Sequence, residues 1–332
     1  MTVGTAPADS ALTTMGLRTV TVICPVYNEE KCVDYFYGRL KDAIADLEGR
    51  IAFQLLFVNN ASTDATYATI QALRARDPSV QVLSHSRNFG YQASIISGLT
   101  NAVGDAFVII DVDCEDPPEM IRDFVRHWED GYDIVYGLRA ARPEAAALVG
   151  MRKLFYRLTH AIADVDFIVD MAEFSLFTAR VRRQVLRHHS TYPFVRSDLA
   201  FVGFRRLGLP YTREPRRFGE THYNLVRMTK FAVGGILSTS TFPLRILAYI
   251  GLPLAAANAA ASLFSAIGLA GDLRWLALLN WSFLCGALAF LGIYLARVSK
   301  DVTGRPVFIV DRDRTELNGR RVREWHDREA AA

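Results

Sequence analysis

Four acidic side chains stand close together directly after one apolar run of the sequence. The run, residues 106–110, has the length and the branched side chains of a buried strand. The acidic residues that follow it are Asp111, Asp113, Glu115 and Asp116. If the chain stays extended here, Asp111 and Asp113 point to the same side. Two such carboxylates suit Mg²⁺ or Mn²⁺ carrying a diphosphate, because Mg²⁺ usually takes one or two carboxylates and completes its shell with phosphate oxygens and water.

A simpler interpretation of the same stretch is an acidic turn between a strand and a helix. Under this interpretation Asp116 caps the helix that Pro117 and Pro118 open, and for Asp116 we expect that role. For Asp111 and Asp113 we favour the metal, because two neighbouring carboxylates without a cation would repel each other.

The elements that must position these carboxylates alternate between strands and helices. Apolar, β-branched runs predict strands over residues 18–24, 53–58, 80–83, 106–110, 132–138 and 201–211. Helices are expected to end near residues 47, 76 and 103, and another to cover residues 117–130. This alternation predicts an α/β fold with a largely parallel sheet, whose ligands gather at the carboxyl ends of the strands.

Several motifs of phosphate and hydrolase chemistry are absent from the sequence. No GxGxxG follows the first strand, and there is no GxxxxGK[ST], GxSxG or HExxH, which excludes the common dinucleotide, P-loop, serine hydrolase and zinc protease classes. The net charge of +3 over 332 residues gives no nucleic-acid footprint. The four cysteines show no CxxC spacing, which predicts reduced thiols instead of a disulfide frame or a zinc site.

Two uncharged apolar runs near the C-terminus, residues 247–270 and 275–296, are each long enough to cross a bilayer as a helix. Only residues 271–274 join them, which favours a membrane hairpin over the buried helices of a soluble protein. Basic residues flank the pair, whereas the connection carries only Arg274, so the positive-inside rule places the N-terminal domain and both termini in the cytoplasm. We expect an integral protein of the cytoplasmic membrane, and the small residues of the first span allow a homo-oligomer.

Residues 225–241, just before the first span, repeat apolar side chains at helical spacing, with Arg227 and Lys230 opposite. This pattern, next to a bilayer, favours an interfacial helix lying on the membrane over an ordinary surface helix.

The order of the polar segments resembles that of family 2 glycosyltransferases. These segments are residues 25–30, 59–66, 86–90, 111–119 and 217–224, ahead of the hairpin. More closely, the chain looks like the membrane-bound polyprenyl-phosphate sugar transferases, the group that holds dolichyl-phosphate mannose synthase and bactoprenol glucosyltransferases. The resemblance runs from Val20 to Val310. It implies a GT-A nucleotide-diphospho-sugar transferase fold, an inverting transfer, and an undecaprenyl-type polyprenyl phosphate as acceptor at the membrane face.

This resemblance, together with the apolar runs, divides the chain into five parts. They are a disordered N-terminal tail (1–17), a GT-A catalytic domain (18–224), an amphipathic interfacial helix (225–242), a transmembrane hairpin (243–297) and a cytoplasmic C-terminal tail (298–332).

The resemblance also implies roles for individual residues. Asp111 and Asp113 match the family's DxD site for Mg²⁺ or Mn²⁺, and with Arg139 and Glu173 they are the expected catalytic residues. Glu173 falls where these enzymes commonly carry Asp near the acceptor. The positions that match the nucleotide-sugar pocket are Pro25, Tyr27, Glu29, Asn60, Arg87, Asp111 and Glu115. Those that match phosphate-binding positions, and would receive the acceptor phosphate, are Arg139, Arg217, His222 and Tyr223, with Arg216 beside them.

Two departures from the family pattern bear on function. The family typically has two Asp residues where this chain has Asn59 and Asn60, and an amide adds donors and removes charge. The QxxRW motif of processive synthases is absent, so a single sugar is expected per cycle. A phosphate acceptor is already anionic near neutral pH, so we expect Glu173 to position it instead of abstracting a proton.

Two alternatives stay open at this stage. One is a membrane-anchored binding or scaffold protein that has lost turnover, which Asn59 and Asn60 motivate. The other is a transferase acting on a soluble or protein hydroxyl, which would need a true general base.

Overall fold

The chain forms two compact units. The computed structural model describes residues 16–139, 171–188, 190–191, 193–217, 241–266 and 274–328. The first unit holds the N-terminal domain together with the stretch from Pro306 onward, and the second holds two long helices. The expected interfacial helix over residues 225–242 lies almost wholly outside the described residues.

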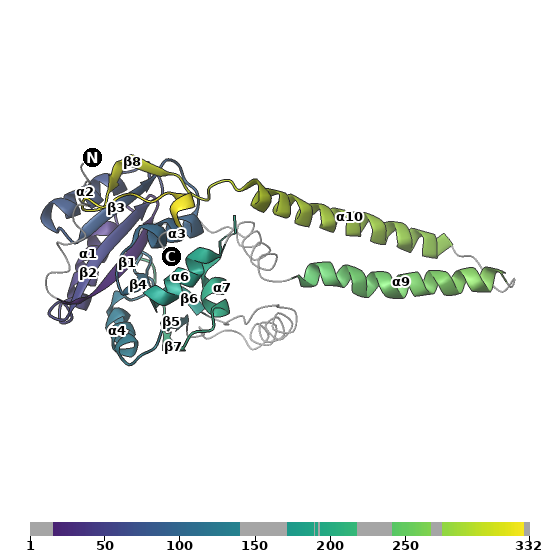
Figure 1. Cartoon of the computed structure of the whole chain (residues 1–332), viewed down its shortest axis with the longest axis horizontal. Coiled ribbons are helices and arrows are strands. Elements are labelled where there is room, and N and C mark those ends of the chain that lie inside the picture. Colours follow the sequence, from purple (N-terminus) through teal and green to yellow (C-terminus); the bar gives the residue numbers. More distant parts are fainter. Residues whose placement is uncertain are drawn as a thin grey trace, which may run out of the picture. The chain divides into compact units, whose positions relative to one another are not determined.

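Strands and helices alternate through most of the first unit (Figure 1). Its strands are β1 (Arg18–Val26), β2 (Ile51–Asn59), β3 (Val80–His85), β4 (Ala106–Ile109), β5 (Ile134–Arg139), β6 (Met171–Thr178), β7 (Arg206–Tyr211) and β8 (Val310–Glu316). Its helices are α1 (Val33–Ile44), α2 (Thr66–Arg76), α3 (Tyr91–Asn101), α4 (Ile121–Glu129), α6 (Ala179–Arg187) and α7 (Val195–Phe201), with short 3₁₀ turns η2 (Pro118–Met120) and η3 (Trp325–Asp327).

The strands of the first unit form one sheet in the order β7-β5-β6-β4-β1-β2-β3-β8. Its centre, β4-β1-β2-β3, is parallel, and so is the β5-β7 pair, whereas β6 and β8 run antiparallel to their neighbours. The predicted α/β class with a mostly parallel sheet is therefore confirmed.

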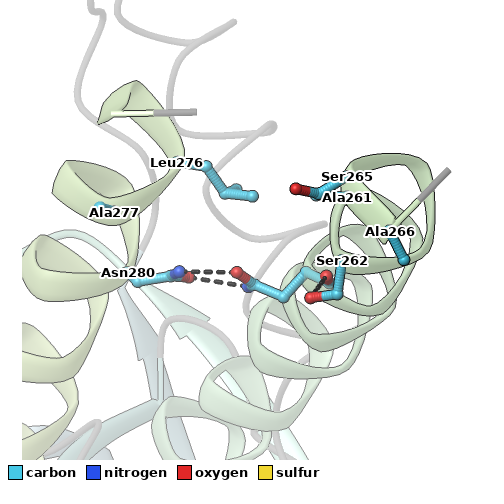
Figure 2. Close-up of a pocket in the computed structure, with 8 residues that line it drawn as sticks. Ala261, Ser262, Ser265, Ala266, Leu276, Ala277 and Asn280 are labelled. Carbon is cyan, nitrogen blue, oxygen red and sulfur yellow. Dashed lines mark hydrogen bonds between the residues drawn. The ribbon is translucent and has the colours of Figure 1, made fainter. Parts of the chain in front are cut away.

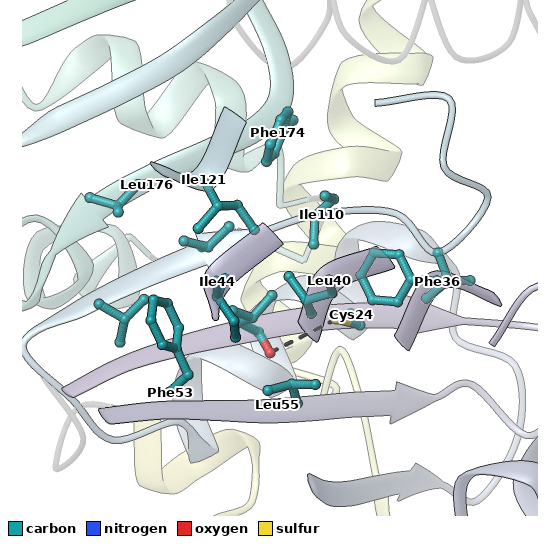
Figure 3. Close-up of a cluster of buried hydrophobic side chains, with 14 of the residues drawn as sticks. Cys24, Phe36, Leu40, Ile44, Phe53, Leu55, Ile110, Ile121, Phe174 and Leu176 are labelled. Carbon is teal, nitrogen blue, oxygen red and sulfur yellow. Dashed lines mark hydrogen bonds between the residues drawn. The ribbon is translucent and has the colours of Figure 1, made fainter. Parts of the chain in front are cut away.

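Helices cover both faces of the sheet. The core on one face combines inward residues of the strands with α1, α2 and α4, and Figure 3 shows Phe36, Leu40 and Ile44 of α1 packed over Cys24 and Leu55. The core on the other face is built with α3, α6, α7 and the C-terminal stretch. Because both faces are covered, the central strands are buried on both sides, as parallel strands with helical crossovers require.

Helix α4 illustrates how the sequence sets this packing. Its buried residues are Ile121, Phe124, Val125 and Trp128. Their spacing of three and four places them on one face of the helix, against the sheet. The charged residues between them face outward. The helix predicted over residues 117–130 therefore forms as the turn η2 followed by α4, which ends at Glu129.

Two stretches of the first unit differ from the sequence expectation. Residues 201–211 were expected to be a strand, but α7 continues to Phe201 and β7 begins only at Arg206. The stretch expected to be a tail contains β8, which pairs antiparallel with β3. In the same stretch Phe308 is fully buried, and the edge of its ring packs against Trp325.

The second unit contains α9 (Phe242–Ala266) and α10 (Arg274–Thr303), which contact each other. Both helices are long and apolar enough to cross a membrane, and almost none of either span is buried. Asn258 and Asn280 exchange two side-chain hydrogen bonds of 2.9 and 2.8 Å between the helices. The two amides line a pocket together with small and polar side chains. Figure 2 shows Asn280, Ser262 and Ser265 at this pocket. In an apolar environment such a pair joins the two helices, since neither amide has water as an alternative partner.

Candidate active site

The polar segments named above meet at one edge of the sheet. In the paired register Val26 of β1 lies opposite Asn59 of β2, and β4 runs parallel to β1 on its other side. Consequently the residues after these strands leave the sheet together, as the parallel topology predicts. Three of the four non-glycine residues with left-handed φ in the described chain lie here: Asn28, Ala61 and Cys114. Sparsely populated backbone conformations of this kind cluster at functional sites.

The acidic pair lies just beyond the end of β4. Burial alternates along this stretch, with Asp111, Asp113 and Glu115 partly exposed and Val112 and Cys114 buried. Desolvation, and then the charge of Asp113, raise the pKa of Asp111 to about 7, although the Tyr91 hydroxyl donates a hydrogen bond to it and acts in the opposite direction. An oxygen of Asp113 accepts the backbone N–H of Glu115 at 3.0 Å, which fixes the turn around Cys114. Asp111 and Asp113 are therefore held close together, where their negative charges repel each other.

No cluster of three or more His, Cys, Asp or Glu side chains suited to a metal is found among the described residues. Two carboxylates do fit an ion that takes its remaining ligands from phosphate oxygens and water. Hence the site suits a metal that arrives with a diphosphate better than a resident structural metal.

Three arginines compensate the acids around this pair. Arg216 contacts Glu29 at 2.6 Å, and Arg213 contacts Glu115 at 2.8 Å. Positive and negative charges are thus nearly balanced around the acidic pair, since Arg139 also lies 3.7 Å from Asp116. Burial acts to lower the pKa of Arg139, but its hydrogen bond to Tyr211 and the charges of Asp116 and Asp111 outweigh burial and raise it.

Asp116 does not cap the following helix, so that expectation was wrong. The residue before η2 is Pro117, and no side chain caps this turn. Instead the buried carboxylate of Asp116 accepts a 2.5 Å hydrogen bond from the Tyr211 hydroxyl and a 3.3 Å bond from Arg213. Asp116 therefore fastens the acidic turn to the end of β7, a role that its long-range partners explain.

The carboxylate of Glu173, on β6, lies near the acidic pair, because its charge acts on Asp111. One of its carboxylate oxygens accepts a 3.0 Å hydrogen bond from Gln92, and Arg196 lies 3.9 Å away. The other oxygen is buried without a hydrogen-bond partner in the described chain. Burial raises the pKa of Glu173, although Arg196 acts against it. Since the charge of Glu173 also acts on Tyr91, as that of Asp111 does, the two carboxylates lie near a common hydroxyl.

The side chain of Asn60 forms hydrogen bonds with three other residues of the protein. The side chain is 4% exposed. Its oxygen accepts hydrogen bonds from the backbone N–H of Phe89 at 2.9 Å and from His85 Nδ1 at 3.0 Å, and its amide group donates to Asn88 at 2.9 Å. Asn60 thus holds the loop that carries Arg87, and the guanidinium of Arg87 lies 4.0 Å above the Phe89 ring.

The remaining predicted site residues are distributed around the same edge. Pro25 is buried in β1, whereas Tyr27 is exposed. Arg217 hydrogen-bonds the hydroxyl of Tyr35. His222 and Tyr223 lie outside the described residues.

The chain is similar in sequence to known glycosyltransferases. The family model described as glycosyl transferase family 2 matches residues 21–189. An uncharacterized glycosyltransferase of Bacillus subtilis is 32% identical over 316 residues, covering 92% of this chain and 97% of that protein. A prophage bactoprenol glucosyl transferase homolog of Escherichia coli is 32% identical over 305 residues, covering 88% and 98%. A mannosyltransferase of Pyrobaculum calidifontis, solved with GDP-Man and Mn²⁺, is 18% identical with a TM-score of 0.47, covering 90% and 91%.

The chain belongs to glycosyltransferase family 2. The resemblance stated from the sequence is confirmed, and so is the expected GT-A type of fold with its mostly parallel sheet. The long helices are candidate membrane spans.

Sequence reasoning missed several residues that build the site. Tyr211 and Gln92 orient Asp116 and Glu173, and Arg196 lies beside Glu173. The position of Gln92 directly after the segment 86–90 was the one available signal. Nothing in the local sequence marks Tyr211 or Arg196, because their partners lie far away along the chain.

Proposed function

We propose that this glycosyltransferase moves a single sugar, with inversion, from a nucleotide-diphospho-sugar to an undecaprenyl-type polyprenyl phosphate, giving a polyprenyl-phosphate sugar. The observation that carries the proposal is that Asp111 lies beside Asp113 and shares the surroundings of the Tyr91 hydroxyl with Glu173, in a chain with two candidate membrane spans. The Escherichia coli relative that is named for bactoprenol glucosyl transfer supports the same acceptor.

Asp111 and Asp113 are proposed to hold Mg²⁺ or Mn²⁺ together with the donor diphosphate. The raised pKa of Asp111 supports this assignment, because a carboxylate that is costly to ionise beside Asp113 gains most from a cation. When bound, the ion neutralises charge that grows on the leaving diphosphate.

The chain's own residues would serve the donor in three ways. Glu115 and Glu29 keep Arg213 and Arg216 beside the acidic pair, where guanidinium groups suit phosphate oxygens. The sequence had placed Arg216 with the acceptor phosphate, and its pairing with Glu29 is the reason why we now propose it for the donor. Pro25 and Tyr27 at the end of β1 line the nucleotide pocket, and Asn60 acts through the loop that carries Arg87. Charge that develops on the diphosphate is thereby met by groups already in place.

On the acceptor side, Glu173 is proposed to position the phosphate and not to remove a proton. The acceptor phosphate is already anionic near neutral pH, with a second pKa of about 6 if it behaves as a monoester. Arg139, Arg217, His222 and Tyr223 are proposed to receive it.

The proposed arrangement in the membrane is the one expected from the sequence. Residues 18–224 form the catalytic domain in the cytoplasm, residues 225–242 lie on the membrane surface, and residues 243–297 cross it twice. Residues 298–332 return to the cytoplasm, following the positive-inside rule.

A direct test compares acceptors with purified protein in detergent and Mn²⁺ or Mg²⁺. Undecaprenyl phosphate is offered beside soluble alcohols and a peptide carrying serine, with a panel of labelled UDP- and GDP-sugars. The proposal predicts one labelled lipid product that mild acid hydrolyses to the free sugar. Label on a soluble hydroxyl would support the hydroxyl transferase, and donor binding without any product would support the scaffold.

A further inference from the structure

Arg39, on α1, binds two carboxylates from distant parts of the chain. Its guanidinium donates to Glu119 at 2.7, 2.8 and 3.0 Å and to Glu214 at 2.9 and 3.0 Å. Glu119 belongs to the η2 turn after the acidic stretch, and Glu214 lies in the segment after β7. The side chain of Arg39 is only 18% exposed, whereas both carboxylates are nearly half exposed. One partly buried cation therefore joins the two segments.

The segment that Arg39 holds, residues 212–217, carries the arginines of the donor side. On either side of Glu214 are Arg213, paired with Glu115, and Arg216, paired with Glu29. The backbone N–H of Glu214 also donates to the carbonyl of Glu115 at 2.8 Å. The segment thus lies against the acidic turn, and Arg39 joins it to Glu119 of η2.

The geometry of this contact sets it apart from an ordinary surface ion pair. A single exposed pair contributes little because its side chains lose entropy and water screens it. Here the guanidinium fork is engaged on both edges, which fixes orientation as well as distance. The bond to Arg39 also lowers the pKa of Glu214, so that Glu214 stays ionised.

We propose that Arg39 is a positioning residue for the donor diphosphate, acting through Glu214 to keep Arg213 and Arg216 beside the acidic pair. This inference rests on the proposed function. Arg39 itself touches neither acid of the pair in the structure, and its hydrogen bonds go to Glu119 and Glu214. We call the contact of Arg39 with Glu119 and Glu214 the clamp. Without it, segment 212–217 is held by fewer bonds, and its arginines neutralise the charges of Glu29 and Glu115 less well.

The test uses full-length Arg39→Met and Arg39→Lys, with Glu214→Gln as a variant that keeps the Arg39–Glu119 contact. Arg76→Met serves as matched control, because Arg76 forms an exposed 2.9 Å ion pair with Asp34 of the same α1 helix. The first readout is limited trypsin digestion of the folded protein, followed by mass spectrometry at the bonds after Arg213, Arg216 and Arg217. This readout does not depend on any reaction.

Cleavage at these bonds is expected to be faster in Arg39→Met and Glu214→Gln than in wild type and Arg76→Met. In the transfer assay the same two variants are expected to raise the donor KM by about tenfold, equal to roughly 1.4 kcal/mol, with a smaller change in kcat. Arg39→Lys should fall between, since an ammonium cannot engage both carboxylates with a planar fork.

The outcomes separate the inference from the function on which it rests. Faster cleavage without any lipid product from wild type would leave the clamp in place and overturn the proposed function. Unchanged cleavage in Arg39→Met and Glu214→Gln would overturn the clamp, even if wild type makes the lipid product. An equal rise in KM for Arg76→Met would also overturn it.

Discussion

Acidification from pH 7 to pH 4 is expected to destabilise this protein through His85. The imidazole at the end of β3 is 2% exposed and lies between Asn60 and Ser97, at 3.0 and 2.7 Å. Phe308 from the C-terminal stretch stacks on the ring with centroids 5.9 Å apart. The backbone N–H of Phe89 donates to the same Asn60 oxygen, and an oxygen of this kind only accepts. Nδ1 of neutral His85 therefore carries the hydrogen.

Burial lowers the pKa of His85 to about 4 from its ordinary 6.5. Each pKa unit corresponds to 1.36 kcal/mol, so the difference amounts to about 3 kcal/mol of unfolding free energy. Between these two pH values the unfolded chain binds more protons at this residue than the folded chain, so stability rises with pH. The contribution is complete above pH 6.5 and is lost as the pH falls toward 4. For a chain of this size we expect a change in Tm of roughly 6–12 °C from His85 alone.

The assay is thermal unfolding of full-length protein in detergent at several pH values from 4 to 7, for wild type and His85→Gln. Buried carboxylates such as Glu173 and Asp198 have raised pKa values and act in the opposite direction. They are common to both proteins and cancel in the difference. The exposed His326 provides the control variant His326→Gln. If wild type and His85→Gln lose Tm in parallel as the pH falls, the reasoning about His85 is refuted.

Three further predictions concern the C-terminal stretch, the acceptor side and the hairpin. Phe308→Ala should lower the unfolding free energy by about 3–5 kcal/mol, because it removes a fully buried ring that packs against His85 and Trp325. Since 1 kcal/mol corresponds to roughly 2–4 °C in Tm, a Tm within about 2 °C of wild type would contradict this. Glu173→Gln should keep transfer to the lipid phosphate within about tenfold, whereas loss of a general base would lower kcat by about 10²–10⁴-fold. Asn258→Leu and Asn280→Leu should each destabilise the hairpin, and a double-mutant cycle in detergent should give a coupling of roughly 0.6–1.7 kcal/mol; additive effects would show that the amide pair contributes nothing.

The elements that sequence predicted well are those whose burial is regular. The runs of β1, β2 and β4 and the apolar face of α4 read directly as buried strands and an amphipathic helix, because each pattern repeats within the element itself. The position of the acidic pair followed from the same reasoning, since parallel strands deliver their ends to one edge.

The elements that sequence did not predict depend on distant partners. The sequence of β8 is Val-Asp-Arg-Asp-Arg-Thr-Glu, which has no strand-like apolar pattern, and it forms a strand because β3 offers it an edge. Asp116 lies 95 residues from Tyr211, and Arg39 lies 175 residues from Glu214. Local spacing carries no signal for contacts of this kind.

The most direct test of the central claim is the initial rate of sugar transfer to undecaprenyl phosphate in detergent, measured against Mn²⁺ and Mg²⁺ concentration for wild type and Asp113→Asn. The account predicts a metal-dependent lipid product from wild type, and a loss of at least about 10²-fold in Asp113→Asn, because one of the two carboxylates proposed to hold the ion is neutralised. Lipid product formed equally well by Asp113→Asn, or by wild type with the metal chelated, would contradict it.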